Sequence, residues 1–369
     1  MTTQEQHPLH GGQLRQLAER FGIPVSQLLD FSANINPDGP PPTVVSAIHK
    51  SLDSLSVFTN YPDLHEIELK RAIARYTGVP AENISVANGF VSLLEAALRA
   101  LPIRHCLIPV PAFVEYRKTL ERAGVETSIH KLSSESRFNY DLGATITGEH
   151  NAILLANPQN PSGVCHDASL IRNLVAAAQQ KGIYILLDEA FIDYVPEHSL
   201  TADTDEFPNI IVFRSVTKFF GIPGLRVAYA VANPRLSHLM SENVSPWAIT
   251  TLASIGANAA LDDRSYAIHS RIRNAERRIT LEREIASLGL VVYPSAANFI
   301  LFQIPPEVDP DTFWLHMIRR HRIVLRNCAN YESLPEGHFR AAVRTPEENN
   351  KLTAAIAESL GSPRTTGQP

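Results

Sequence analysis

Short apolar runs alternate with amphipathic segments from about residue 65 to residue 240, and this alternation limits the possible folds more than any other feature of the chain. The runs "HCLIPV", "NAILLA", "IYILL" and "NIIVF" are typical of strands, and helical patterns such as "DASLIRNLVAAAQQKG" lie between them. Continuous apolar runs suit strands that are covered on both faces, and strand–helix alternation favours a parallel sheet. The sequence therefore predicts an α/β fold with a large, mostly parallel sheet.

The pattern changes after about residue 245. A long helical stretch at roughly 247–288 leads to short apolar strands, and a last helix begins with a capping-box pattern at Thr345. These elements predict a smaller α+β domain, and the chain is long enough for two domains. We expect three parts, which are an N-terminal arm that packs with the small domain, a large domain and the small C-terminal domain: 1–45, 46–245 and 246–369.

Composition excludes several classes of function. The formal net charge of −5 gives no basic field that would attract nucleic acid. No apolar run approaches the ~18 residues that a membrane span needs, and the first residues lack the pattern of a signal peptide. The three cysteines are far apart and favour reduced thiols in a cytoplasm. The fourteen histidines show no metal-binding spacing, so we expect no metal, no nucleic acid and no membrane partner.

Polar and aromatic residues follow the ends of successive strands. Ligands bind beyond the carboxyl ends of the strands in an open parallel sheet. Gly89 opens a helix whose backbone N–H groups could hold a phosphate, and Phe113 follows the next strand and could stack on a flat ring. Asn160 lies in the loop "NPQNPSG", and Asp188 ends an apolar run. Each residue alone also fits an ordinary role in a turn, a core or a structural ion pair.

The stretch "SVTKFFGIPGLR" completes this order. Ser215 and Thr217 follow the run "NIIVF", Lys218 comes next, and Arg226 precedes another strand. One cofactor uses a phosphate cradle, an aromatic ring, an amide, a carboxylate and a lysine together. That cofactor is pyridoxal phosphate, whose aldehyde a lysine amine can hold covalently.

The motifs "NPQNPSG", "DEAF" and "SVTKFFGIPGLR" resemble the fold-type I aminotransferase superfamily in order and spacing, over roughly residues 30–350. The resemblance implies that Lys218 holds the cofactor, that Asp188 pairs with its pyridine nitrogen and that Asn160 bonds its phenolic oxygen. It also implies that Phe113 stacks on the ring of the cofactor and that Tyr61 reaches the partner subunit's cofactor in a homodimer. The residues implied in holding the phosphate are Gly89, Phe90, Ser215, Thr217 and Arg226.

Within the superfamily, the chain is most similar to the threonine-phosphate decarboxylases of cobalamin biosynthesis. The stretches "HGG", "DFSANINP", "DEAFIDY" and "LRNCANY" carry this similarity. Histidinol-phosphate aminotransferases, the main alternative, usually have a tyrosine in place of Phe191, and the decarboxylases also have phenylalanine there. The turn "NGFVSLLE" departs from the more polar turn that we would expect, so the phosphate cradle would depend more on backbone groups.

This resemblance implies loss of the carboxylate from L-threonine O-3-phosphate, a substrate with two anionic ends. We expect guanidinium groups to bind both ends, because their paired N–H groups suit carboxylate and phosphate. The candidate substrate-binding residues are His10, Asn34, Asn160, Arg326, Arg340 and Arg344. Serine phosphate is a second possible substrate, because one methyl group changes binding by only ~1–3 kcal/mol.

Overall fold

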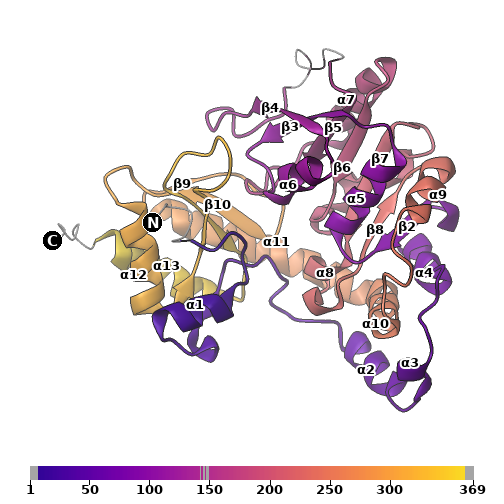
Figure 1. Ribbon diagram of the computed structural model, residues 1–369. Coiled ribbons are helices and arrows are strands. Elements are labelled where there is room, and N and C mark those ends of the chain that lie inside the picture. Colours follow the sequence, from indigo (N-terminus) through magenta and orange to yellow (C-terminus); the bar gives the residue numbers. More distant parts are fainter. Residues whose placement is uncertain (1–6, 142, 144–145, 147–148, 362–369) are drawn as a thin grey trace.

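The computed structural model describes residues 7–141, 143, 146 and 149–361. It contains a large sheet, a smaller sheet and the helices that cover them (Figure 1). The predictions for the first six and last eight residues lie outside the described residues. No helix in the described part of the chain is long and apolar enough to cross a membrane. The same residues contain no group of three or more His, Cys, Asp or Glu side chains that could hold a metal ion.

Seven strands form the large sheet, in the order β2-β8-β7-β6-β5-β3-β4. Their bounds are β2 Ile84–Ala87, β3 His105–Val110, β4 Glu126–Lys131, β5 Ala152–Ala156, β6 Tyr184–Asp188, β7 Ile210–Ser215 and β8 Ala228–Val231. Strands β4, β3, β5, β6 and β7 pair in parallel, whereas β8 runs antiparallel to both β7 and β2. The predicted α/β fold with a mostly parallel sheet is therefore confirmed.

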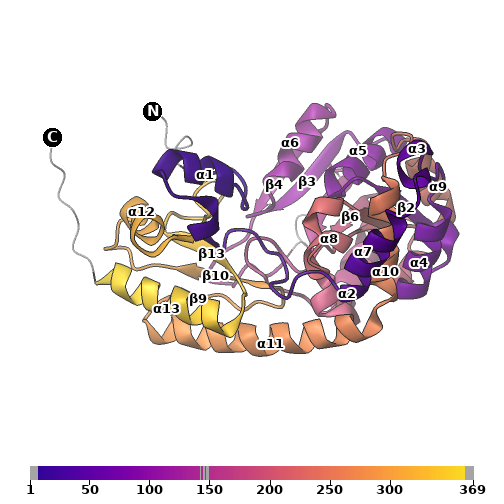
Figure 2. The same cartoon turned by 90° about the horizontal axis from the view of Figure 1, so that it is seen from below.

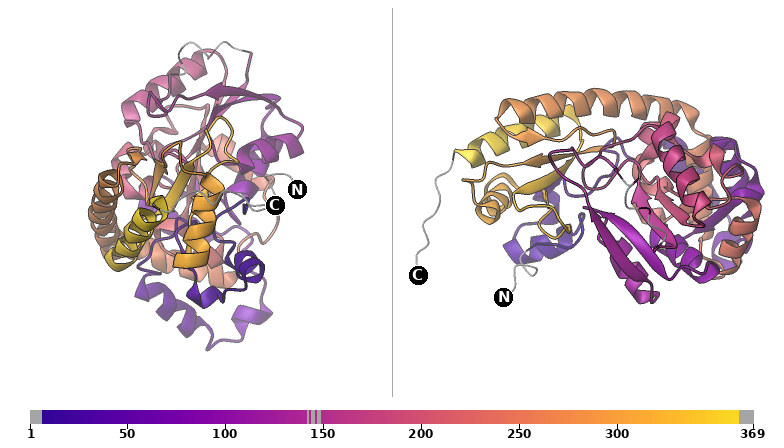
Figure 3. Two further views of the ribbon diagram at one scale, coloured as in Figure 1. Left: turned by 90° about the vertical axis from the view of Figure 1, so that its left-hand side faces the viewer. Right: turned by 90° about the horizontal axis from the view of Figure 1, so that it is seen from above.

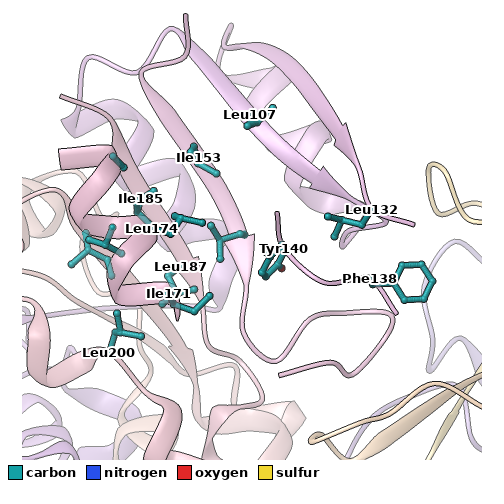
Figure 4. Packing of buried hydrophobic residues seen from close by; sticks show 14 of the residues in the cluster. Leu107, Leu132, Phe138, Tyr140, Ile153, Ile171, Leu174, Ile185, Leu187 and Leu200 are labelled. Carbon is teal, nitrogen blue, oxygen red and sulfur yellow. The ribbon is translucent and has the colours of Figure 1, made fainter. Parts of the chain in front are cut away.

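Alternate residues of the central strands enter different cores, as the two-residue period of a strand requires. Leu186 packs on the face that α5, α6 and α9 cover, while Ile185 and Leu187 pack on the face of α7 (Figure 4). Helices α4 and α10 cover the end of the sheet near β2 and β8. The bounds of these helices are α4 Ile67–Thr77, α5 Phe90–Ala100, α6 Glu115–Arg122, α7 Ala168–Gln180, α9 Pro234–Glu242 and α10 Thr251–Asp262.

The smaller sheet is antiparallel, with the order β12-β13-β10-β9. Its strands and helices are β9 Val291–Val292, β10 Phe299–Gln303, β12 Arg326–Asn327, β13 His338–Ala342, α11 Arg264–Ser287, α12 Pro310–His321 and α13 Pro346–Leu360. The stretch expected at 247–288 is two helices, because Asp263 ends α10 and its side chain caps α11. Helix α11 runs alongside both parts of the molecule (Figure 2). Helix α13 begins with the predicted capping box at Thr345.

The first part of the N-terminal segment, with α1 Leu14–Phe21 and β1 Leu29–Asp30, lies against the C-terminal elements (Figure 3). The next helices, α2 Pro42–Ser51 and the short α3 Ser56–Thr59, lie instead on the side of the large sheet, where α2 packs against α10. Strand β1 pairs in parallel with β11, which spans Ile323–Val324. Leu17 and Phe31 join the core that contains Trp314, so the segment is fixed by apolar burial as well as by backbone pairing. The exact domain boundaries at 45 and 245 stay predictions.

Candidate active site

Parallel strands end side by side at one edge of the large sheet. Asp188, the last residue of β6, pairs in register with the end of β5 and with Phe213 of β7. Strand β7 ends at Ser215, whose side chain caps the one-turn helix α8, Val216–Phe219. Helix α8 contains Lys218. Because parallel strands point the same way, their carboxyl ends bring the lysine and the carboxylate to the same edge, as the sequence predicts.

Lys218 lies in a partly buried, aromatic environment. Its Nζ is 5.3 Å from the centroid of the Phe191 ring. Removal from water lowers the pKa of Lys218 from its usual value; Asp188 acts in the opposite direction, and the positive charges of Arg226 and Arg340 lower the pKa further. A larger fraction of neutral amine makes Lys218 a better nucleophile than a solvated lysine.

Asp188 is a buried carboxylate that is held by two donors. Its Oδ2 accepts a hydrogen bond of 2.5 Å from the Tyr116 hydroxyl, and its Oδ1 accepts one of 2.9 Å from the backbone N–H of Ala190. Burial raises the pKa of Asp188, whereas these donors and the Lys218 charge favour its ionised form. A buried acid with these partners could pair with a cationic ring nitrogen.

The predicted phosphate-binding residues lie at one edge of the large sheet, because Ala228 of β8 is the register partner of both Ala87, at the end of β2, and Ser215, at the end of β7. Gly89 caps the helix with φ +91°, and a Cβ at this position would lie 2.6 Å from Nη2 of Arg226. Arg226 itself has the left-handed φ of 57°, an uncommon conformation for a residue other than glycine. Phe90 is the first residue of the helix, and the hydroxyls of Ser215 and Thr217 lie 2.8 Å apart. Arginine, hydroxyls and a helix N-terminus together suit a phosphate.

Arg340 lies in β13 and is buried. Its Nη1 donates to Asn160 Oδ1 at 2.5 Å and to the Tyr331 hydroxyl at 3.3 Å, and its Nη2 donates to the backbone carbonyl of Ser32 at 3.0 Å. Its Nε is buried without a hydrogen-bond partner in the described structure. All three acceptors are uncharged, so this guanidinium has no carboxylate partner among the described residues.

Arg326 faces Arg340 across the smaller sheet, because the two residues are register partners in β12 and β13. Its guanidinium donates to the backbone carbonyls of Pro8 and Leu9 and to Asn330 Oδ1, and it lies 5.2 Å from the ring centroid of Tyr331. These acceptors are also uncharged. The described residues therefore place two buried, like-charged side chains directly opposite each other, an arrangement that is destabilising unless an anion lies near them.

The arm brings His10 to the large sheet. The His10 Nε2 lies 3.1 Å from Glu115 Oε1 at the start of α6, and its ring centroid is 6.2 Å from that of Phe113. Burial lowers the pKa of His10, although Glu115 opposes this shift. Phe113 packs edge-on against Tyr116, with ring centroids 5.7 Å apart. The predicted stacking residue and the predicted substrate residue are therefore neighbours.

Two other predicted substrate residues differ in their surroundings. Asn34 is buried, and its Oδ1 has no hydrogen-bond partner in the described structure. Arg344 forms a two-point ion pair with Glu348, and its Nη1 donates to the backbone carbonyl of Asp30. The guanidinium of Arg344 is thus already neutralised, which leaves Arg326 and Arg340 as the better candidates for an anionic ligand.

Tyr61 is remote from these groups and 80% exposed. It stacks on Trp247, with ring centroids 4.7 Å apart. Among the described residues its ring contact is therefore with Trp247, and its role toward a partner subunit stays a prediction.

Two residues that the sequence does not single out also belong to the site. Tyr116 holds Asp188, and Tyr331 contacts both Arg326 and Arg340. A tyrosine in an amphipathic helix usually reads as a core residue, so the only sequence signal for Tyr116 is its position three residues after Phe113. Tyr331 lies in the quoted stretch "LRNCANY", but its contacts depend on the pairing of β12 with β13.

The donors and acceptors fit pyridoxal phosphate. The space between Gly89 and Arg226 is kept open by the missing Cβ, and a buried carboxylate and a partly buried lysine lie at the same strand ends. The unpartnered Asn34 Oδ1 and Arg340 Nε leave a polar acceptor and a charged donor for a ligand. Unpaired buried polar atoms are costly, so these atoms are expected to find partners when ligands bind.

Comparison with known proteins identifies the family of the chain. Residues 26–356 match the model of the family described as aminotransferase class I and II. Threonine-phosphate decarboxylase of Salmonella typhimurium is 33% identical over 95% of this chain and 96% of that protein, and histidinol-phosphate aminotransferase 2 of Ralstonia nicotianae is 30% identical over 95% and 93%. The crystal structure of histidinol-phosphate aminotransferase from Clostridium acetobutylicum superposes with a TM-score of 0.83 at 26% identity, covering 90% of this chain and 98% of that one. The chain therefore belongs to the class I and II aminotransferase family.

Proposed function

We propose that the protein is a pyridoxal-phosphate-dependent decarboxylase that converts L-threonine O-3-phosphate to (R)-1-aminopropan-2-ol O-phosphate for cobalamin biosynthesis. The observation that carries the proposal is the pair of buried guanidiniums, Arg326 and Arg340, that face each other without a carboxylate among the described residues. A substrate with a carboxylate and a phosphate supplies the two missing negative charges. The Salmonella relative, by its name, acts on threonine phosphate, which supports the same choice.

The cofactor would be held by residues already described. Lys218 would bind its aldehyde, Asp188 its ring nitrogen, Asn160 its phenolic oxygen and Phe113 its ring face, while the group around Gly89 would bind its phosphate. When bound, pyridoxal phosphate supplies a ring that accepts the electron pair released at Cα of an amino acid.

Lys218 has two tasks in this proposal. Its lowered pKa keeps a fraction of the amine neutral, so that Nζ can act as a nucleophile. After the Cα–carboxylate bond has broken and carbon dioxide has left, Lys218 in its protonated form would donate a proton from Nζ to Cα. Asp188, whose two oxygens accept hydrogen bonds from Tyr116 and Ala190, would in its ionised form hold a proton at the ring nitrogen.

Arg340 is the best candidate for binding the substrate carboxylate. Its Nε has no partner in the described structure, and its Nη1 already contacts Asn160, the expected neighbour of the cofactor. Arg326 lies opposite and joins the arm to the site through the carbonyls of Pro8 and Leu9. A phosphate near Arg326 would therefore also meet the arm, where His10 lies.

A histidinol-phosphate-type aminotransferase is the second candidate, and the 30% identity to the Ralstonia enzyme favours it. Histidinol phosphate has no carboxylate to place beside one of the two guanidiniums. In that reaction, only the second substrate, an amino acid, would bind both Arg326 and Arg340. Phe191 also counts against this candidate, because its ring has no hydroxyl to bond the phenolic oxygen and instead packs edge-on against Phe299. A decarboxylase that prefers serine phosphate stays a variant of the main proposal.

Phosphorus NMR tests the proposal directly. The protein is loaded with pyridoxal phosphate and incubated with L-threonine phosphate alone, and carbon dioxide is measured in parallel. A new phosphomonoester signal with release of carbon dioxide and no 2-oxo acid present is the expected result. An inert mixture, together with glutamate formation from histidinol phosphate and 2-oxoglutarate, would instead identify an aminotransferase. The same assay with serine phosphate then measures the preference for the methyl group.

We also propose that the active form is a cytoplasmic homodimer with shared sites. Large apolar side chains are exposed around α3 and the start of α4: Leu55, Phe58, Tyr61, Leu64 and Ile67. An exposed apolar surface of this kind is typical of a protein interface. Light scattering on the purified protein tests the dimer, and a monomer that retains full activity would contradict it.

A further inference from the structure

We propose that Tyr116 is a positioning residue of the cofactor site. Its phenol orients the Asp188 carboxylate and favours the ionised form, so that this carboxylate can pair with the ring nitrogen of pyridoxal phosphate. The inference rests on the cofactor of the proposed function, but it does not depend on which substrate the protein uses. It concerns the charge at one atom, the ring nitrogen, and so can be tested without any reaction.

The carboxylate of Asp188 is fixed at both oxygens. Tyr116 donates to Oδ2, and the backbone N–H of Ala190 donates to Oδ1. The main chain of Asp188 is also fixed, because its carbonyl accepts a hydrogen bond of 2.9 Å from Asn157 N. Each oxygen keeps a second lone pair for another donor. The side chain is therefore preorganised, and a ring N–H that reaches it needs no reorganisation of the protein.

The phenol that fixes Asp188 is itself held firmly. Tyr116 is 1% exposed, and its ring packs against those of Phe90, at 5.4 Å, and Phe113, at 5.7 Å. Phe90 opens the helix of the phosphate cradle, and Phe113 is the predicted stacking residue. One side chain thus touches three groups that would contact the phosphate, the face and the nitrogen of the same cofactor.

The hydroxyl keeps its proton in this position. Burial raises the pKa of Tyr116 well above its usual range, and the nearby charge of Asp188 acts in the same direction. Tyr116 is therefore a donor and Asp188 an acceptor. In a buried site, loss of this donor would make protonation of Asp188 easier. A proton shared between Asp188 and the ring nitrogen would then move toward the carboxylate, and the ring would become a weaker electron acceptor.

The test uses the Tyr116→Phe variant, which keeps the ring packing on Phe90 and Phe113 and removes only the hydroxyl. Wild type and variant are loaded with pyridoxal phosphate that carries ¹⁵N in the ring, and the ¹⁵N chemical shift is measured in the absence of substrate. We expect the wild-type shift to report a protonated nitrogen and the variant shift to move toward that of neutral pyridine. An unchanged shift in the variant overturns the inference.

Tyr76→Phe is the matched control. The Tyr76 hydroxyl also donates to a carboxylate, Asp193 Oδ1 at 2.8 Å, but Asp193 is paired with Arg214 and lies outside the cofactor site. This variant is expected to lose stability without moving the ¹⁵N shift. If Tyr76→Phe moves the shift as much as Tyr116→Phe does, the effect is general loosening of the fold and the inference fails.

Cofactor affinity gives a second readout. The dissociation constants of pyridoxal phosphate and of an analogue with carbon in place of the ring nitrogen are compared in wild type and Tyr116→Phe. Loss of a hydrogen bond to a charged group is expected to weaken pyridoxal phosphate about tenfold or more and the analogue much less. Equal weakening of both compounds would show a purely structural role. A wild-type protein that binds no labelled cofactor would overturn the cofactor assignment itself, an outcome distinct from an unchanged shift.

Discussion

The Gly89→Ala variant is expected to damage the phosphate cradle through a single methyl group. Gly89 has φ +91° and ψ 168°, a region that is almost restricted to glycine and costs a residue with a side chain about 1–3 kcal/mol. The new Cβ would also lie 2.6 Å from Arg226 Nη2, whereas comfortable contacts need about 3.5 Å. The guanidinium must therefore move by about 1 Å, away from the position where it would bind the phosphate.

The two effects of this substitution can be separated. Loss of one charge-assisted hydrogen bond corresponds to about 1.5–3 kcal/mol, so the affinity for pyridoxal phosphate should fall roughly tenfold to a hundredfold, measured by fluorescence titration of the protein without cofactor. Gly78→Ala is the control, because Gly78 has φ +80° and no atom within 4 Å of its added Cβ. It should lower the unfolding temperature and leave cofactor affinity unchanged. The reasoning is refuted if Gly89→Ala binds the cofactor as tightly as Gly78→Ala does.

Three further predictions follow from other parts of the molecule. Arg340→Gln should raise the KM for threonine phosphate at least tenfold in steady-state kinetics, since it removes a buried charge from the site; an unchanged KM would exclude Arg340 from substrate binding. Burial raises the pKa of Glu66 to about 7, so the folded protein favours the neutral carboxyl. The free energy of unfolding therefore falls as the pH rises toward 8 and this carboxyl ionises. Glu66→Gln should therefore lose less stability than wild type between pH 5 and 8 in thermal unfolding, by on the order of 1–2 kcal/mol after allowance for screening by water, and parallel curves would contradict this. Tyr61→Ala should weaken activity, and more so at low protein concentration, whereas unchanged activity at both low and high concentration would mean that Tyr61 does not act across an interface.

The order of the site residues could be predicted from the sequence because the sheet converts chain order into spatial order. Asp188 and Lys218 follow apolar runs, and the carboxyl ends of parallel strands lie at one edge, so their proximity needs no knowledge of side-chain packing. The antiparallel direction of β8 could not be predicted in this way. Strand β7 is linked to it through α8 and a short turn, and an apolar run reads the same in both directions.

The roles of the arginines depend on contacts that no local pattern contains. Arg326 binds the carbonyls of Pro8 and Leu9, which precede it by more than 300 residues. Arg344 reads in the sequence like Arg340, but only Arg344 has a glutamate one helical turn further on, at position 348, to neutralise it. Local sequence gives the residue type, and only the pairing of β12, β13 and the arm determines which charges remain without a partner.

The two unneutralised guanidiniums also suggest how the site could select one bond for cleavage. Arg326 and Arg340 are register partners on neighbouring strands, so the distance between them is fixed by the smaller sheet and not by flexible loops. A substrate held at both anionic ends could still rotate about the line that joins them. Its amino group, held at the cofactor beside Lys218, would provide a third fixed point and remove that rotation. Three fixed points would determine which bond at Cα is oriented for cleavage. The placement of the arginines, more than the cofactor, would then decide between loss of the carboxylate and loss of the proton.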